Sequence, residues 1–297
     1  MRALSLALLL SATSALAEPP KVMTDIVPVQ SLVDMVMGDI GQAGALMPPG
    51  ASPHSFALRP ADATALANAD VVIWTGPGLS LWLTEPLATL APDAATLVLL
   101  DTSGWQRLDV RNEPSFTAPP KPDTLTVTDP HAWMDPDIAA VWLGHIATTL
   151  ASADPDNAAI YRDNAATAAA ALRDLGAGIA TRLAPLADRP FVLPHDGYRY
   201  FENRFGLHPA GAITLSGGTS PGPADLAELR DLVKAGGIDC ILTDAETSQK
   251  WVDLLGEGMA EIKTARIDGL GGSYPPGADN YPTMLGQMAD ALVGCLS

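Results

Sequence analysis

The sequence predicts an α/β fold of two doubly wound lobes with parallel-rich sheets, joined by one long backbone helix. Short apolar runs alternate with helical patterns along both halves of the chain, which is typical of parallel sheets covered by helices. An Ala-rich helical pattern over residues 155–183 separates the two halves and would span roughly 40 Å at 1.5 Å per residue. The chain has 297 residues, which is more than one hydrophobic core usually organises.

The first half begins its alternation of strands and helices after residue 20. Residues 71–75 are largely apolar, as expected for a strand that is buried on both faces. Pro60 begins a helix because proline is favoured in the first turn, and Asp135 followed by Pro136 marks the start of another. The expected strands cover residues 21–27, 43–46, 71–75 and 96–100, and the expected helices cover residues 29–38, 60–68, 79–89 and 136–150.

Residues 106–124 interrupt this pattern. They contain four prolines among scattered polar groups, and they contain no histidine. Because proline fixes φ and removes a backbone donor, this stretch predicts an extended loop or lid.

The long helical pattern and the segments that follow it complete the fold. Alanine favours the helix, although Gly176 and Gly178 weaken its last turns. The expected strands of the second half cover residues 191–193, 212–215, 240–243 and 264–267, and the expected helices cover residues 198–205, 223–235, 248–257 and 281–296. The predicted division is an N-terminal lobe over residues 18–153, a connecting helix over residues 154–185 and a C-terminal lobe over residues 186–297.

The first 17 residues have the pattern of a cleaved secretory signal peptide. Arg2 provides the positive region, residues 3–10 the apolar region, and Ala15-Leu16-Ala17 the small-x-small cleavage site. The apolar stretch is too short to span a bilayer, and there is no cysteine near the cleavage site that could carry a lipid anchor. The sequence therefore predicts a soluble, exported protein of the periplasm.

The charge balance and the cysteines narrow the class further. A formal net charge of −17 argues against partners such as nucleic acid or anionic membrane surfaces. Cys240 and Cys295 are the two cysteines, an even count in an exported chain, which favours a disulfide between them over two free thiols. Two cysteines so far apart make a poor zinc knuckle, so neither is placed in a metal site.

The histidines carry the functional signal. Three of the five, His54, His131 and His195, lie in short Pro- or Asp-flanked segments after apolar runs, and Asp268 follows another such run. Intervals of roughly 75 and 65 residues exclude a local metal finger but suit a site at the ends of several strands. Three imidazoles and one carboxylate are a complete tetrahedral shell for zinc. Each residue also has a purely structural interpretation, as a loop histidine or, for Asp268, as an Asp-Gly turn.

Four segments together resemble a known family. They are Pro48-Pro49-Gly50-Ala51-Ser52-Pro53-His54, Asp129-Pro130-His131-Ala132-Trp133-Met134-Asp135-Pro136, His195-Asp196-Gly197-Tyr198-Arg199-Tyr200-Phe201 and Asp268-Gly269-Leu270-Gly271. In this order they resemble the signatures of the metal-specific substrate-binding proteins of ABC transporters, often called cluster A-I, and the resemblance covers essentially the whole chain after the signal peptide. It implies metal held in the cleft between two lobes by His54, His131, His195 and Asp268, and delivery to an inner-membrane permease.

The third histidine position bears on the identity of the metal. Zinc-type members of the family resemble this chain in having His just before the segment 198–201, whereas manganese-type members usually have Glu there. Imidazole suits zinc and added carboxylates suit manganese, so His195 favours Zn²⁺. Many zinc-type members have a His-rich loop near the site, but residues 106–124 depart from this pattern, so we do not expect this loop to scavenge metal. A zinc chaperone as a further partner is left open, and we expect a monomer.

Several alternatives remain beside zinc transport. A manganese-binding protein of the same family is one, and a metal-dependent adhesin is another because adhesive relatives share the fold. A zinc hydrolase usually keeps an open coordination position for water, whereas four candidate ligands close the shell here, so we expect no enzyme.

The remaining site-like residues have structural interpretations. His145 on a helix face and His208 beside a proline are expected to be non-ligands, and Trp133 is expected to pack in the core. Asp129 and Asp135 are expected as turn and helix caps that could also orient an imidazole, and Asp196 as a cap or an acceptor near the metal.

Overall fold

The computed structural model describes residues 18–111, 113, 115–116, 127–215, 221–235, 237–238, 240–258 and 262–297. The predicted signal peptide, over residues 1–17, lies outside the described residues, as does most of the predicted loop or lid. Both therefore stay predictions.

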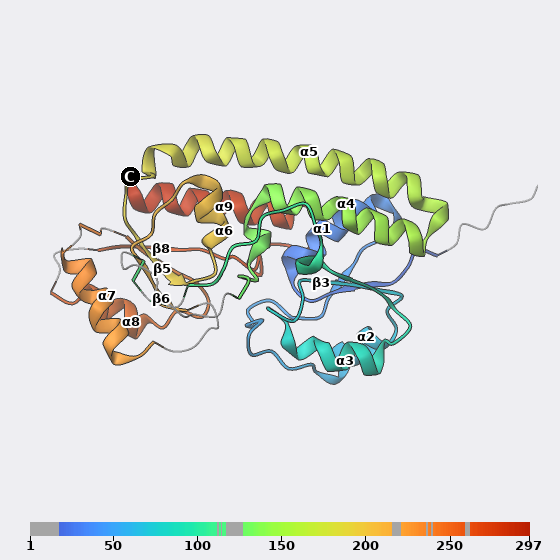
Figure 1. Cartoon of the computed structure of the whole chain (residues 1–297), viewed down its shortest axis with the longest axis horizontal. Helices are drawn as coiled ribbons and strands as arrows, with labels where there is room; N and C mark the ends of the chain where they lie inside the picture. Colours follow the sequence, from blue (N-terminus) through green and yellow to red (C-terminus); the bar gives the residue numbers. More distant parts are fainter. Residues whose placement is uncertain are drawn as a thin grey trace, which may run out of the picture.

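Two four-stranded parallel sheets organise the chain (Figure 1). In the first half the spatial order is β2 (Gly44–Ala45), β1 (Val22–Thr24), β3 (Val71–Trp74) and β4 (Ala95–Val98). In the second half it is β6 (Gly211–Thr214), β5 (Val192–His195), β7 (Cys240–Thr243) and β8 (Lys263–Arg266). All these neighbours pair in parallel, and in both sheets the first strand of the half lies inside the sheet. The α/β class with two parallel sheets is confirmed.

The helices cover the sheets and connect them. They are α1 (Val27–Met37), α2 (Pro60–Ala67), α3 (Thr84–Leu90), α4 (Pro136–Ala153), α5 (Ala158–Leu183), α6 (Arg199–Phe205), α7 (Pro223–Ala235), α8 (Gln249–Gly256) and α9 (Asn280–Leu296). The predicted start of α4 is confirmed, because the Asp135 side chain accepts a hydrogen bond from the Asp137 amide and Pro136 opens the helix.

Helix α5 runs beside both sheets and packs on α1, α4 and α9 (Figure 1). Its 26 residues continue through Gly176 and Gly178, which the sequence indicated as weak points. Gly176 has a packing reason, because a Cβ added there would lie 3.0 Å from Cγ of Pro136 at the start of α4. The small residue allows the two helices to approach closely.

The main hydrophobic core is continuous across both halves. It includes residues from α1 and α4 of the first half and from α9 of the second, such as Val29, Trp142 and Met284, along the inner face of α5. Two smaller clusters lie under the outer helices, one beneath α2 and α3 and one beneath α7 and α8. The predicted lobe boundaries at residues 153 and 185 stay predictions, since this core joins the two halves.

Some element boundaries differ from the sequence prediction for local reasons. The first strand ends at Thr24 because Val27 and Pro28 already begin α1. The helix expected over residues 79–89 consists of a 3₁₀ turn, Leu81–Leu83, followed by α3. The strand expected over residues 191–193 continues to His195, which places this histidine on the last residue of β5. No helix among the described residues is long and apolar enough to cross a membrane.

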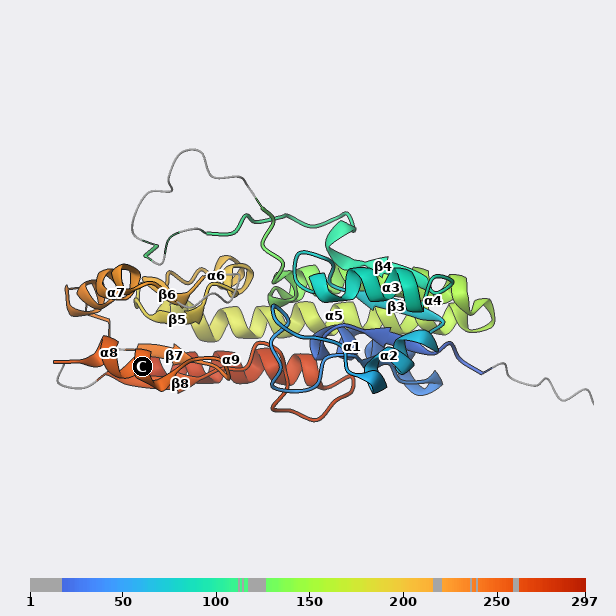
Figure 2. The same ribbon diagram turned by 90° about the horizontal axis from the view of Figure 1, so that it is seen from below.

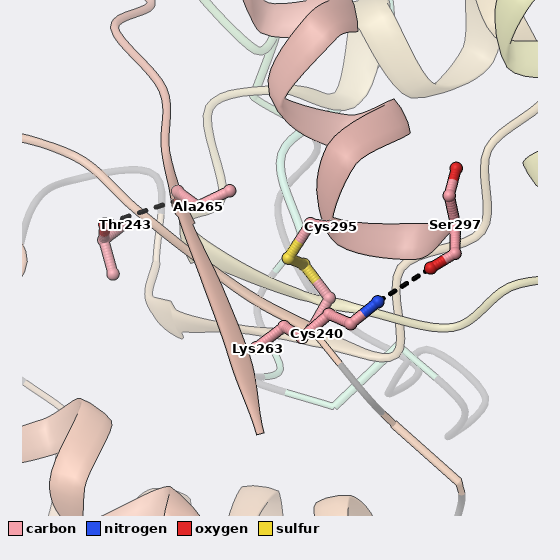
Figure 3. The surroundings of a disulfide bond; sticks show 6 residues. All are labelled: Cys240, Thr243, Lys263, Ala265, Cys295 and Ser297. Atoms are coloured by element: carbon pink, nitrogen blue, oxygen red, sulfur yellow. Dashed lines mark hydrogen bonds between the residues drawn. A yellow bond between two sulfur atoms is a disulfide. The ribbon is translucent and has the colours of Figure 1, made fainter. Parts of the chain in front are cut away.

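A disulfide joins Cys240, at the start of β7, to Cys295, near the end of α9, as predicted (Figure 3). Both cysteines are buried. The bond ties the terminal helix to an inner strand of the second sheet, across a sequence separation of 55 residues.

Removing this disulfide should destabilise the protein. For a loop of this length, the chain-entropy model gives a loss of about 4 kcal/mol in the free energy of unfolding for Cys240→Ala/Cys295→Ala. Urea denaturation of the double variant against the oxidised wild type measures the loss. A loss below about 1 kcal/mol would contradict a stabilising role for the bond.

Candidate metal centre

Three histidines from distant parts of the chain meet at one cavity. His54 lies in the loop after β2, His131 in the turn before α4, and His195 at the end of β5. The ring centroids of His54 and His131 are 5.5 Å apart, and those of His131 and His195 are also 5.5 Å apart. The structure therefore brings the three predicted histidines together and places two from the first half against one from the second.

The cavity that they line has a volume of about 270 Å³. It is lined by residues 49–51, 53 and 54, residues 131, 133 and 134, and, from the second half, residues 195, 198, 244–246, 266, 268–270, 272 and 273. The two halves thus share one cavity, and the fourth predicted residue, Asp268, is part of its wall.

Asp129 orients His131. One carboxylate oxygen, Oδ1, accepts a hydrogen bond from the His131 amide at 2.9 Å and lies 2.7 Å from Nδ1 of the same residue. Asp129 and His131 are both buried, and Nε2 of His131 has no hydrogen-bond partner. Because Nδ1 is engaged by the carboxylate, Nε2 is the ring nitrogen left to coordinate a metal ion. This is the arrangement of a metal-binding histidine that a carboxylate orients.

Asp244 orients His195 in the same way as Asp129 orients His131, and this residue was not predicted from the sequence. Its Oδ2 lies 3.0 Å from Nδ1 of His195, while its Oδ1 accepts hydrogen bonds from Thr247 and from the Glu246 amide. Although burial alone would raise it, the hydrogen bonds to His195 and Thr247 hold the pKa of Asp244 below its usual value. The available signal was its place directly after an apolar run, as for His195 and Asp268.

His195 and Asp244 lie at the position where a doubly wound sheet forms a crevice. β5 and β7 are neighbours in space, but their connections lead to opposite sides of the sheet. Ligands of such sheets bind beyond the carboxyl ends of the strands at this point. In the first sheet the corresponding residue, Asp25, is buried and accepts hydrogen bonds from Thr75 and Ser80, so that half contributes through its loops instead.

Asp268 reaches the cavity with its carboxylate held by its own loop. Its Oδ1 accepts a hydrogen bond from the Leu270 amide at 3.0 Å, and its Oδ2 accepts one from the Ser273 amide at 2.7 Å. Among the residues that the structure describes, no three His, Cys, Asp or Glu side chains are close enough to form a finished metal-binding group. The role of all four residues as ligands therefore stays a prediction.

Burial sets the protonation state of His54. Its Nε2 is buried without a hydrogen-bond partner. Burial, and then the neighbouring His131 and His195, lower the pKa of His54 to about 3. The imidazole is therefore neutral near neutral pH, which is the state that binds a metal ion.

Glycines allow the two halves to approach at the cavity. A Cβ added to Gly197 would lie 2.2 Å from Nε2 of His195 and 3.0 Å from Cδ2 of His131. One added to Gly272 would lie 3.3 Å from the backbone of Pro49 and Gly50, across the cleft. Only a residue without a side chain fits between the two imidazoles at position 197.

The residues that we did not expect to be metal ligands differ in whether they contact the cavity. His145 is bound to the Ser103 carbonyl through Nε2 at 3.1 Å, and His208 is exposed, so neither joins the cavity. Trp133 is buried in the core as expected, but it also lines the cavity and donates its indole N–H to the carbonyl of Gly269 across the cleft. Asp196 is buried and binds Arg111.

Comparison with known proteins supports the resemblance. A family model described as "ZnuA: Zinc-uptake complex component A periplasmic" matches residues 22–295. The high-affinity zinc uptake system protein ZnuA of Paracoccus denitrificans strain Pd 1222 is 36% identical over 315 residues, with 99% of this chain and 97% of that protein covered. The protein of the same name from Brucella suis biovar 1 strain 1330 is 31% identical, with 96% and 94% covered.

A solved structure agrees with the fold. The crystal structure of ZnuA matches with a TM-score of 0.80 at 23% sequence identity, covering 94% of this chain and 100% of that chain. The two-lobed arrangement is therefore shared along nearly the whole length of both chains.

The close approach at Gly197 gives a first prediction. Gly197→Ala should push the His195 ring out of place and weaken zinc binding by about tenfold or more. Gly178→Ala in α5 is the matched control, since a Cβ there meets nothing within 4 Å. Competition titration against a zinc-binding dye measures both variants, and an unchanged affinity in folded Gly197→Ala protein would show that His195 is not a ligand.

The lowered pKa of His54 gives a second prediction, for metal-free protein. Below about pH 6.5 the unfolded chain binds a proton at this residue that the folded chain does not bind until about pH 3. The free energy of unfolding should therefore fall with falling pH, by at most about 1.4 kcal/mol per unit from His54 alone. Urea denaturation with a chelator present should show a shallower pH dependence for His54→Gln than for wild type.

His208→Gln on the surface is the control for this measurement and should keep the wild-type pH dependence. Equal pH dependence in His54→Gln and wild type would mean that His54 is protonated as readily in the folded protein as in the unfolded chain.

Proposed function

The chain belongs to the ZnuA family of periplasmic zinc-uptake components, and we propose that it captures zinc in the periplasm and delivers it to the permease of an ABC importer. The observation that carries this proposal is the meeting of His54, His131 and His195 from both halves at one cavity. The proposal is also supported by two buried polar atoms, Nε2 of His54 and Nε2 of His131, which have no hydrogen-bond partner. Such atoms are costly unless something binds them.

In this proposal the zinc ion is the cargo, held by the three Nε2 atoms and a carboxylate oxygen of Asp268. Asp129 and Asp244 keep Nδ1 of His131 and His195 engaged, so that Nε2 faces the ion. Outer carboxylates of this kind raise the basicity of the imidazole and fix its orientation. They also add negative charge around a dication whose direct ligands include only one carboxylate.

An ion bound across the cleft would contact both halves of the molecule. Two ligands precede α5 in the chain and two follow it, so the ion would join the two halves of the molecule. A bound ion should then hold the halves together, and the loaded form presents a surface that a permease can distinguish from the metal-free form. Release requires that at least one half withdraws its ligands.

Manganese is the alternative cargo, and the structure offers it additional oxygen donors. Asp244 and Glu246 line the cavity beside His195. We favour zinc because three imidazole donors suit zinc better than manganese, and because the carboxylate of Asp244 already binds His195 and Thr247.

Export and division into lobes complete the proposal. We propose that residues 1–17 are a cleaved signal peptide and that the mature protein works as a monomer in the periplasm. The lobes over residues 18–153 and 186–297, joined by residues 154–185, would move only as far as their shared core allows.

Replacing single ligands tests the proposal. His54→Ala, His195→Ala and Asp268→Ala should each weaken zinc binding by about a hundredfold or more, equivalent to about 2.8 kcal/mol. His131→Gln is preferred to His131→Ala, because the buried carboxylate of Asp129 would otherwise lose its partner. Competition titration measures zinc affinity, and the same titration with Mn²⁺ should show weaker binding to wild type.

The controls are His145→Ala and His208→Ala, which should change zinc affinity by less than about twofold. If His195→Ala binds zinc as tightly as wild type, the proposed ligand set is wrong. If wild type binds Mn²⁺ more tightly than Zn²⁺, zinc is the wrong cargo.

A further inference from the structure

A segment of the first half crosses to the second half beside the metal centre. We call residues 108–111, 115 and 116 the crossing segment. The Leu108 amide donates to the hydroxyl of Tyr200 in α6 at 3.0 Å, and the Phe116 amide donates to the carbonyl of Ala210 at 2.9 Å. Ser115 forms an antiparallel bridge to Gly211, on the outer strand β6. In Figure 2 the chain leaves β4 and runs to the side of the second sheet where α6 and β6 lie.

Arg111 makes the charged contacts between the crossing segment and the second half. Its Nε donates to Oδ1 of Asp196 at 2.9 Å, and Nη1 and Nη2 donate to the two carboxylate oxygens of Glu202 at 2.9 and 2.7 Å. The guanidinium also stacks on Phe116, with 3.5 Å from Cζ to the ring centroid. The side chains of Asp196 and Glu202 are 0% and 7% exposed, so these bonds are shielded from water. Fork-shaped pairs of this kind fix direction as well as distance.

The carboxylates bound by Arg111 lie next to a candidate ligand. Asp196 follows His195 directly and precedes Gly197, where an added Cβ would lie 2.2 Å from Nε2 of His195. Arg111 is the charged partner of the buried Asp196 side chain. The position of Arg111 therefore bears directly on where β5 ends and where the His195 ring lies.

The same segment is bound to the residue that orients His131. Leu108 accepts a hydrogen bond from the Asp129 amide at 2.8 Å, Val110 donates to the Val127 carbonyl at 2.9 Å, and an antiparallel bridge joins positions 109 and 128. Asp129 in turn contacts Nδ1 of His131. A chain of direct contacts thus runs from His131 through Asp129, the crossing segment and Asp196 to His195.

We propose that Arg111 is a positioning residue of the metal centre, which sets the place of His195 relative to His131 by binding Asp196 and Glu202 from the opposite half of the molecule. This inference rests on the proposed function as a metal carrier. It assigns the crossing segment the role of a strap between the two halves.

The test requires a variant that does not fail for a trivial reason. Arg111→Met alone would leave two buried carboxylates facing each other, and burial already raises the pKa of Glu202 to about 7 against the pull of Arg111. The triple variant Arg111→Met/Asp196→Asn/Glu202→Gln removes the charge cluster as a whole. Arg111→Lys keeps the charge but loses the fork, so it should recover part of the function.

A matched control exists in the same region. Arg204 of α6 pairs with Asp137 of α4 at 2.8 Å and lies 3.8 Å from a carboxylate oxygen of Asp135, so it also joins the two halves by ion pairs. None of these three residues lines the metal cavity or directly neighbours a candidate ligand in the chain. Arg204→Met therefore removes an interhalf ion pair without touching the metal centre.

The first measurement is made without metal. Hydrogen exchange at residues 195–198 should be faster in the triple variant than in wild type by about tenfold, and unchanged in Arg204→Met. Unchanged exchange at these residues in the folded triple variant would overturn the proposal. Because no metal is present, this result does not depend on whether zinc is the cargo.

The second measurement uses metal. The triple variant should bind zinc about tenfold or more weakly, mainly through faster dissociation, and its Co²⁺ complex should have an altered d–d spectrum at saturation. Arg204→Met should keep the wild-type affinity and spectrum, and Arg111→Lys should be intermediate. Wild-type affinity and spectrum in the triple variant, or equal losses in the triple variant and in Arg204→Met, would overturn the proposal.

Discussion

The shared direction of the parallel strands is the constraint on which the metal centre depends. Within a parallel sheet all carboxyl ends lie at one edge, so the residues that follow the strands meet there whatever their separation in the chain. β5 ends at His195, β7 is followed by Asp244, and β8 is followed closely by Asp268, and all three line the cavity. The first half adds His54 and His131 from the loops that face this edge.

Burial then determines what these side chains can do. His54 stays neutral because the surrounding protein disfavours its charged form, while Asp129 and Asp244 occupy Nδ1 of the other two imidazoles. Burial therefore keeps His54 in the neutral form that binds a metal ion, and the two carboxylates fix the ring orientation of His131 and His195. The same residues affect both stability and metal binding. Nε2 of His54 and Nε2 of His131 have no hydrogen-bond partner in the metal-free protein and would gain a partner when an ion binds.

Much of the fold could be predicted from the sequence, because its signals are local. The alternation of apolar runs and helical patterns, the Asp135-Pro136 helix start and the Ala-rich helix are all readable over a few turns. The disulfide was predicted from an even cysteine count in a chain with a predicted export signal, and the structure confirms it. The three histidines were recognisable because each lies in a short, distinctive motif at the end of an apolar run.

What the sequence missed depends on contacts between distant segments. Asp244 contacts His195 only because β7 lies beside β5, an order that strands need not follow along the chain. The contact of Arg111 with Asp196 arises where a proline-rich stretch of the first half crosses to the second, and its composition indicated only a loop. The continuous core escaped prediction for the same reason, since α1 and α9 meet only in the folded chain.

The most direct test of the central claim is a crystal structure of the zinc-loaded protein with anomalous data collected at the zinc absorption edge. We expect one strong anomalous peak in the cavity, about 2.0–2.2 Å from Nε2 of His54, His131 and His195 and from a carboxylate oxygen of Asp268. Asp129 and Asp244 should remain on the Nδ1 atoms of their histidines. A peak outside the cavity, or one bound by fewer than two of the three histidines, would contradict a zinc site built from these four residues.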